Sequence, residues 1–277
     1  MGDNPNNIPL KRKWWAFQAH RPELYRRLAS MTRVLVTSQV NPRFGFSFMS
    51  ADYIFSHRAI VFCIDSYSGF GIIQSSVHEL WARAFSSTSM ELINYAPSDC
   101  FETFPFPKGW ESQHTLEVAG KACYDFRAKL MVRNKEGLTK TYNRFHDPNE
   151  DSADIRHLRT LHDDMDRAVL DAYGWQDIQP VCEFVPDNDD EDDEEESGPT
   201  KRKKYRYRWP EEIHDEVLAR LLDLNRKQAL EEGQLLADDI SSTVATAPPK
   251  RRRAKKNSGE SENRAPINGL FAVEEEV

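Results

Sequence analysis

The sequence predicts an α+β protein: a mixed α/β region, then a helical hairpin, then a partly disordered C-terminal tail. Short runs rich in β-branched and aromatic residues occupy the first part of the chain, which is typical of strands. From Thr115 onward, apolar residues recur at helical spacing instead. Residues 187–196 hold nine acids in ten positions, and such a run cannot bury a core.

Composition and charge limit the class of protein. The chain has 277 residues, of which 39% are hydrophobic, enough for one or two domains. Its net charge of −8 arises entirely after residue 182, because residues 1–182 hold 21 basic and 21 acidic residues. Residues 1–45 hold eight basic and two acidic residues. This cationic front suits either a phosphate-binding surface or an ordinary solvated surface.

The sequence predicts a cytoplasmic protein with no membrane partner. It contains no run of about 18 apolar residues that would cross a bilayer. Its first residues lack the apolar segment of a signal peptide. The cysteines are far apart and form no C-x-x-C pair, so we expect reduced thiols and neither a disulfide framework nor a zinc site. They are Cys63, Cys100, Cys123 and Cys182.

The N-terminal stretch combines cations with aromatic rings. Residues 1–10 are expected to be a disordered lead, followed by the basic run 11–13 and by Trp14, Trp15 and Phe17. Cations beside rings suit a nucleic-acid backbone, although the rings are equally explained as the first core residues. Pro22 then starts a helix that runs to about Ala29.

The mixed region contains three predicted strands and one predicted helix. Residues 33–38, 44–49 and 59–65 are the strands, separated by turn signals such as Asn41-Pro42. Ser76 and Glu79 form a capping-box pattern that predicts a helix start, with an apolar face behind it. We expect that helix to end in a polar loop at residues 86–89.

An aromatic strap, residues 94–107, connects this region to the helices. Four aromatic residues alternate with three prolines, and Pro105 and Pro107 exclude a helix. The strap must therefore be extended, and we expect it to pack against other elements as a hinge between two layers. The aromatic residues are Tyr95, Phe101, Phe104 and Phe106.

The second half is predicted to be helical with charged connections. Apolar stripes predict helices over residues 115–133 and 155–172, joined by an irregular link at residues 138–148. After the acidic run comes K-R-K-K-Y-R-Y-R at residues 201–208, and Pro210 starts a third helix. Beyond about Asp239 the chain is polar and expected to be disordered.

The residue patterns suggest no catalytic centre. Gly69-Phe70-Gly71 follows a predicted strand but lacks the rest of a nucleotide-binding fingerprint. Asn41-Pro42-Arg43-Phe44 approaches the N-P-P-[YF] motif that holds a flipped adenine, but Arg43 replaces the second proline, so a turn is the simpler interpretation. His157 and His162 are not at the i, i+4 spacing of metal ligands on a helix.

Several strings spread over residues 11–235 resemble segments of one family. They are RPELY (21–25), QSSVHELW (74–81), SDCFETFPFP (98–107), LTKTYNRFHDP (138–148), IRHLRTLH (155–162), MD (165–166), AYGW (172–175), and WP (209–210) through LLDLN (221–225). Together they resemble the target-recognition and C-terminal region of Type IIG/IIL (MmeI-like) restriction–modification enzymes and related class I adenine-specific DNA methyltransferases of phage defence.

The resemblance implies a division of the chain and a missing part. Residues 11–112 would be the target-recognition domain, 113–180 a helical brace, 181–208 an acidic then basic linker, 209–238 a C-terminal helix and 239–277 a disordered tail. In the family, a methyltransferase domain with S-adenosylmethionine precedes this region, sometimes after a nuclease. We therefore expect a fragment or split chain without its own cofactor, working with a methyltransferase on another chain.

The resemblance also implies that the partner is double-stranded DNA, read so that the methyltransferase can flip the correct adenine. Cations would bind phosphates, and polar side chains in loops and at strand ends would contact bases. We expect weaker duplex binding in Arg33→Ala or Arg43→Ala. The candidates for phosphate binding are Lys11, Arg12, Lys13, Arg26 and Arg27. The candidates for base recognition are Arg33, Ser38, Gln39, Asn41, Arg43 and Arg58, together with residues 86–89.

Two alternatives remain open. The chain could be a protein-interaction module that docks on a separate methyltransferase through helix 155–172 and the aromatic strap, without touching DNA. It could also be a decayed gene fragment whose exposed apolar helices make it poorly soluble. A neighbouring upstream gene encoding the methyltransferase motifs would support a split enzyme.

Overall fold

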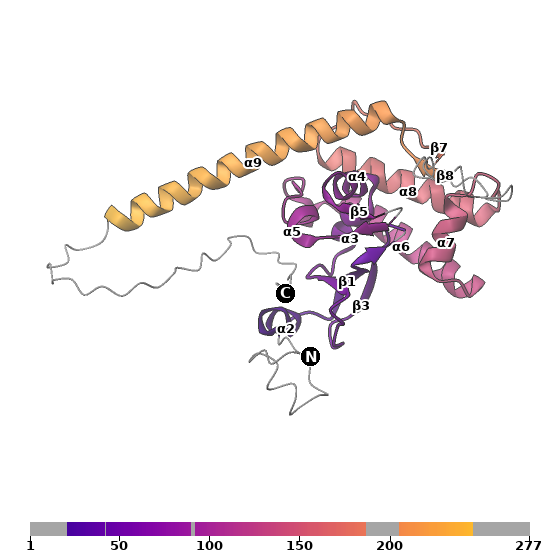
Figure 1. The fold of residues 1–277 in the computed structure, drawn as a ribbon, viewed down its shortest axis with the longest axis horizontal. Helices are drawn as coiled ribbons and strands as arrows, with labels where there is room; N and C mark the ends of the chain where they lie inside the picture. The colour runs from indigo at the N-terminus through magenta and orange to yellow at the C-terminus, as the bar shows by residue number, and fades with distance from the viewer. Residues whose placement is uncertain (1–20, 42, 90–91, 187–204, 246–277) are drawn as a thin grey trace.

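A computed structural model describes residues 21–41, 43–89, 92–186 and 205–245 of the protein (Figure 1). Helices dominate, with small antiparallel sheets, so the predicted α+β class is confirmed. The helices labelled α6, α7 and α8 lie to the right of the main sheet, α9 runs along the top, and α2 lies below (Figure 1).

The main sheet has three strands in the order β3-β1-β4. β1 (Arg33–Ser38) pairs antiparallel with β3 (Ser47–Ser50) and with β4 (Ala59–Phe62). Leu35 opposes Phe62 and packs with it in the central core, whereas Val36 opposes Val61 and packs on the other face. The sheet is therefore buried on both faces. Helix α2 (Pro22–Leu28) covers the second face through buried leucines.

A second sheet, which the sequence did not predict, lies beside the first. It has the order β2-β6-β5, formed by β2 (Val40–Asn41), β6 (Leu92–Asn94) and β5 (Ser87–Ser89). The predicted loop at residues 86–89 is thus mostly a strand. Gln39 links the two sheets, because its N–H donates to the Arg58 carbonyl at 2.8 Å and its carbonyl accepts from Tyr95 N–H at 2.8 Å.

Two consecutive helices cover the inner face of the main sheet. α3 (Tyr67–Gln74) contains the Gly69-Phe70-Gly71 segment, so this segment is helical and buried. α4 (Ser76–Phe85) begins directly after its cap, Ser75, whose hydroxyl accepts from His78 N–H. The predicted capping box of Ser76 and Glu79 is therefore wrong. Glu79 pairs instead with Arg83, one turn further along α4.

The aromatic strap packs in the interior of the protein. It contains a short helix, α5 (Pro97–Cys100), and a turn at residues 101–103, so the predicted extended conformation is wrong over residues 97–103. Residues 104–107 have no regular secondary structure, and η2 (Trp110–Ser112) follows the strap. Tyr95 and Phe101 belong to the core beneath the main sheet, and Phe104 belongs to the core between the helices. Phe106 contacts both cores. The expectation that the strap packs against other elements is confirmed.

The long helices cross close to α3. α6 (His114–Asn134) and α8 (Ala153–Ala172) correspond to the two predicted helices. α7 (Leu138–Phe145) is helical, which corrects the predicted irregular link. α6 approaches α3 closely because glycines meet there: a Cβ on Gly120 would lie 2.1 Å from the Tyr67 carbonyl oxygen and 3.4 Å from Gly71 Cα.

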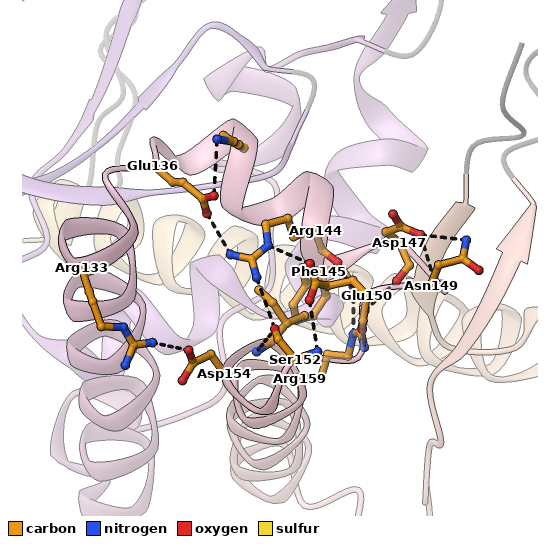
Figure 2. Close-up of polar contacts among 12 residues, drawn as sticks. Arg133, Glu136, Arg144, Phe145, Asp147, Asn149, Glu150, Ser152, Asp154 and Arg159 are labelled. Carbon is orange, nitrogen blue, oxygen red and sulfur yellow. Dashed lines mark hydrogen bonds and ion pairs between the residues drawn. The ribbon is translucent and has the colours of Figure 1, made fainter.

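Arg159 fastens the turn between α7 and α8 (Figure 2). Its guanidinium donates to four backbone carbonyl oxygens at 2.9 to 3.3 Å. Beside it, Arg144 bridges Glu136 at 3.1 Å and Glu150 at 2.9 Å. A cation with five fixed donors suits several carbonyls at once. The turn is therefore held in one conformation. The carbonyls belong to Arg144, Phe145, Asp147 and Glu150.

The last described elements are a hairpin and a long helix. β7 (Glu183–Pro186) pairs with β8 (Tyr205–Arg208), so both ends of the predicted linker are strands. α9 (Glu211–Ala245) packs on the strap through Asn225 and Gln228, which donate to carbonyls of the strap. It then projects past the rest of the molecule (Figure 1). The predicted third helix is confirmed and is longer than expected, because residues 239–245 are helical too.

Candidate nucleic-acid interface

The surface where several predicted DNA contacts meet is formed by α2 and by the segment that joins β3 to β4. We call residues 21–31 and 51–58 the outer layer. The connecting segment passes over the same face of the sheet that α2 covers, because Ala51 and Phe55 share a core cluster with Leu24 and Leu28. The outer layer lies at the end of the molecule away from α8 and α9 (Figure 1).

The outer layer is cationic. It carries four arginines and two acids. Arg26 is exposed and pairs with Glu23, also exposed, at 2.5 Å. Such an exposed pair contributes little to stability and exchanges readily for another partner. Arg58 is exposed at the end of the connecting segment, whereas Arg27 is half-buried on α2. The guanidinium groups of Arg26 and Arg58 are therefore accessible to phosphate oxygens.

Arg33 lies on the inner side of the same sheet and is held by the protein itself. Its guanidinium donates to the Asp65 carbonyl oxygen at 2.8 and 2.5 Å. It also stacks 4.0 Å from the centre of the Phe48 ring and 4.3 Å from that of Tyr67. Cation–π contacts and charge-assisted bonds both favour this position. Arg33 thus joins β1 to the start of α3.

The remaining candidates for base contact are spread over several elements. Ser38 is exposed at the end of β1, and half-buried Gln39 joins the two sheets through its backbone. Both lie close to Arg58 in space, because Ser38 pairs with Ala59 and Gln39 N–H donates to the Arg58 carbonyl. Arg43 donates to the side-chain oxygen of Asn143 on α7 at 2.8 Å, away from this group.

Some predicted contact residues lie outside the described ones, and others were missed. Lys11, Arg12 and Lys13 lie outside the described residues, as do the side chains of Asn41 and of residues 87–89. Tyr53 and Ile54 in the outer layer were missed, although their exposed fractions are 55% and 69%. The signal that could have found them is an apolar pair inside a connection between strands, where polar residues are the norm.

A second polar feature is a small cavity among α3, α4, α7, α8 and β8. Its volume is about 30 Å³, room for one or two water molecules and too little for a nucleobase. It is lined by both acids and histidines. Asp166 accepts from Ser76 N–H at 2.8 Å, and His146 Nδ1 accepts from Tyr207 N–H at 3.0 Å. These bonds tie α8 to α4 and the hairpin to α7.

The electrostatics of this cavity follow from burial. Asp166 is 2% exposed, and burial raises its pKa to about 7 despite the bond from Ser76. Burial, together with the charge of nearby Arg127, lowers the pKa of His162 to about 3. For Glu79, burial opposes ionisation, but Arg83 and Arg206 outweigh it and lower the pKa to about 2. Near neutral pH the cavity is therefore lined by a neutral His162, an ionised Glu79 and Asp166, whose carboxyl group is an unusually weak acid.

A metal site would need a group of ligand side chains, and a cofactor loop would need glycines, in the described part of the chain. No group of three or more His, Cys, Asp or Glu residues in it is arranged to hold a metal ion. Gly69 and Gly71 are buried in helix packing, where a Cβ on Gly69 would lie 2.4 Å from Ile64, so they do not form a loop around a phosphate or S-adenosylmethionine. Among the same residues, no helix is long and apolar enough to cross a membrane.

Comparison with known proteins adds one structural likeness. No protein-family model matches the chain, and no curated protein matches it. A solved structure of the Type IIL restriction–modification enzyme MmeI in complex with DNA has a similar fold, with a TM-score of 0.53 and 16% sequence identity. The matching region covers 82% of this chain and 24% of that chain, so the protein spans about a quarter of the enzyme's length.

This likeness confirms the predicted resemblance to restriction–modification enzymes at a coarse level. It concerns the fold of most of the described residues. The finer assignment of a target-recognition domain stays a prediction, and so do the individual DNA contacts.

Proposed function

We propose that the chain is the DNA-recognition part of a restriction–modification methyltransferase and contacts double-stranded DNA through its outer layer. The observation that carries this proposal is the fold it shares with a quarter of an enzyme solved in complex with DNA. The charge of the outer layer supports the same partner, because phosphates are neutralised by exposed arginines.

Two kinds of contact are expected from the arrangement. Arg26 and Arg58, both exposed, would bind phosphates and set the position of the protein on the duplex. Ser38 and Gln39, at the end of β1 next to Arg58, would supply contacts to base edges. Arg33 would act indirectly, by holding the sheet against α3.

The alternative of a docking module finds less support. It needs the strap and the apolar face of α8 as contact surfaces. Both are used inside the chain, since Phe101 and Phe104 are buried, as are Ile155 and Val169. The same burial argues against a decayed fragment with exposed apolar helices. A partner methyltransferase chain would have to bind elsewhere.

The methyl-transfer chemistry would come from that partner. S-adenosylmethionine would be bound by the methyltransferase, since the glycines that could suggest a cofactor loop here pack helices together. The role of this chain in the reaction would be to place the target base, not to touch the methyl donor.

The test is fluorescence anisotropy of the full chain with a labelled random-sequence duplex at several salt concentrations. We expect binding whose affinity falls steeply with salt, because released counterions dominate. The double variant Arg26→Gln/Arg58→Gln should lower the slope of log affinity against log salt by roughly two, one for each phosphate that is no longer neutralised.

A matched control removes two exposed cations elsewhere. Arg226→Gln/Lys227→Gln changes the charge equally on α9, where both residues form ion pairs with nearby Asp223. It should leave the slope unchanged. No binding by the wild-type chain at low salt would refute the proposal. Equal slopes for the two double variants would refute the assignment of the outer layer.

A further inference from the structure

The connection between β3 and β4 exposes the side chains of two consecutive apolar residues. Tyr53 is 55% exposed and Ile54 is 69% exposed, whereas the next residue, Phe55, is buried in the core under α2. Other strongly exposed apolar residues, such as Val132 and Leu230, lie singly on long helices. Scattered single residues need no explanation, but an adjacent pair at a turn does.

The backbone of this tip is fixed at both ends. Ala51 N–H donates to the Thr32 carbonyl at 3.2 Å, and Tyr53 N–H donates to the Ser50 carbonyl at 3.3 Å. On the far side, Ser56 accepts from Arg58 N–H through its hydroxyl and from Ala59 N–H through its carbonyl. Together with buried Phe55, these bonds keep the side chains of Tyr53 and Ile54 outside the core. The pair is thus preorganised for contact with a partner.

The surroundings select the kind of partner. Arg58 lies four residues after Ile54 in the sequence. Arg26 lies on α2, whose leucines pack in the same core as Phe55. One acid, Asp52, is exposed directly before the apolar pair, but the layer holds four arginines against two acids. An apolar tip in such a net cationic layer complements a polyanion with an apolar interior. Duplex DNA has this character: phosphates outside and stacked bases inside. The minor groove, about 6 Å wide, excludes a helix but admits a narrow turn, and apolar side chains there are known to separate base steps.

We infer that Tyr53 and Ile54 enter the minor groove of bound DNA and partly unstack one base step. This inference rests on the proposed function and adds to it a deformation of the duplex. Arg58 and Arg26 hold the flanking phosphates while the tip presses on the bases. The deformation favours flexible pyrimidine–purine steps, so the tip contributes to sequence preference without hydrogen bonds to bases.

The experiment uses the full chain and short duplexes that carry 2-aminopurine at a TA step. Wild-type binding should increase the 2-aminopurine fluorescence, because unstacking relieves quenching. In Tyr53→Ser/Ile54→Ser this increase should disappear, and affinity should fall about tenfold while the salt slope stays unchanged. Val118→Ser/Val132→Ser is the matched control, since it removes two exposed apolar side chains from α6. A thermal unfolding midpoint equal to that of the wild type checks that each variant folds.

The outcomes separate this inference from the proposed function. Steep salt-dependent binding by the wild type, with no fluorescence change and no loss of affinity in the Tyr53→Ser/Ile54→Ser variant, overturns the inference and leaves the function standing. No duplex binding by the wild type overturns both. If the double variant binds DNA normally but no longer co-purifies with a methyltransferase chain, the tip is a protein contact and the inference is wrong.

Discussion

Gly120 lies where α6 approaches the backbone of α3. We predict that Gly120→Ala destabilises the fold. The added Cβ would lie 2.1 Å from the Tyr67 carbonyl oxygen, which belongs to the backbone of α3 and cannot move aside like a side chain. Alanine gains about 1 kcal/mol of helix propensity over glycine in α6. Overpacking of this kind costs about 1 to 3 kcal/mol, and a contact this short belongs at or above the upper end.

The expected net loss is therefore about 2 kcal/mol of unfolding free energy, or roughly 4 to 8 °C in the unfolding midpoint for a protein of this size. Urea unfolding followed by circular dichroism measures it. The control is Gly233→Ala in α9, where nothing lies within 4 Å of the added Cβ. That variant should be equal to the wild type or slightly more stable. A Gly120→Ala variant as stable as the Gly233→Ala variant would show that α3 and α6 do not meet as described.

Three further predictions concern polar side chains that bind other parts of the chain. Arg159→Met should lose about 3 kcal/mol or more of unfolding free energy in urea titrations, because four carbonyl oxygens lose a charged donor; an unchanged midpoint would contradict the anchoring. Asp166→Asn should be more stable than the wild type at pH 8, by at most about 4 kcal/mol, and the difference should vanish near pH 4. The pKa of Asp166 in the folded protein is raised to about 7, so the wild type loses stability as the pH rises from about 4 to 7. In the variant, the amide oxygen can still accept the hydrogen bond from Ser76 N–H. Curves of stability against pH that run parallel for the two proteins would refute this reasoning. Arg33→Gln should reduce the free energy of unfolding by about 1 to 3 kcal/mol, because the bonds from the guanidinium to the Asp65 carbonyl oxygen are lost. An unchanged unfolding midpoint in calorimetry would show that these bonds do not stabilise the fold.

Elements with a clear apolar pattern were predictable from the sequence. α4 and α8 each carry an apolar stripe on the face that they bury, and β1 is a short apolar run that is buried on both faces, so their positions agree with the prediction. α6 also lies where a helix was predicted. Burial of the strap also followed from its aromatic content, since so many rings need a core. The signal for each of these elements lies within a short stretch of the sequence.

The missed elements depend on contacts distant in the sequence. α3 was missed because Gly69 and Gly71 suggest a loop, whereas here glycine lets α6 approach the helix. β7 and β8 were missed because their pairing spans the acidic run, which gives no signal of a hairpin. α7 was missed because its residues are mostly polar and its burial comes from three positions on one face.

The candidate interface was predictable only in part. Charge indicates Arg26 as a phosphate contact and loop position indicates Arg58 as a base contact, and the structure brings both into one outer layer. The sequence could not show that Arg33 binds the protein itself and not DNA. Its partners, the Asp65 carbonyl and the rings of Phe48 and Tyr67, lie in other elements. Tyr53 and Ile54 could have been singled out as an apolar pair in a connection between strands, but only the structure shows that they are exposed while the neighbouring Phe55 is buried.

Hydrogen exchange of the full chain, with and without a duplex, tests the central claim most directly. We predict slower exchange in residues 21–31 and 51–58 when DNA is added, with no change in α8 or the described part of α9. The effect should disappear at high salt, because phosphate contacts weaken there. Protection confined to the helices α8 and α9, or no protection anywhere at low salt, would contradict the claim that the outer layer binds DNA.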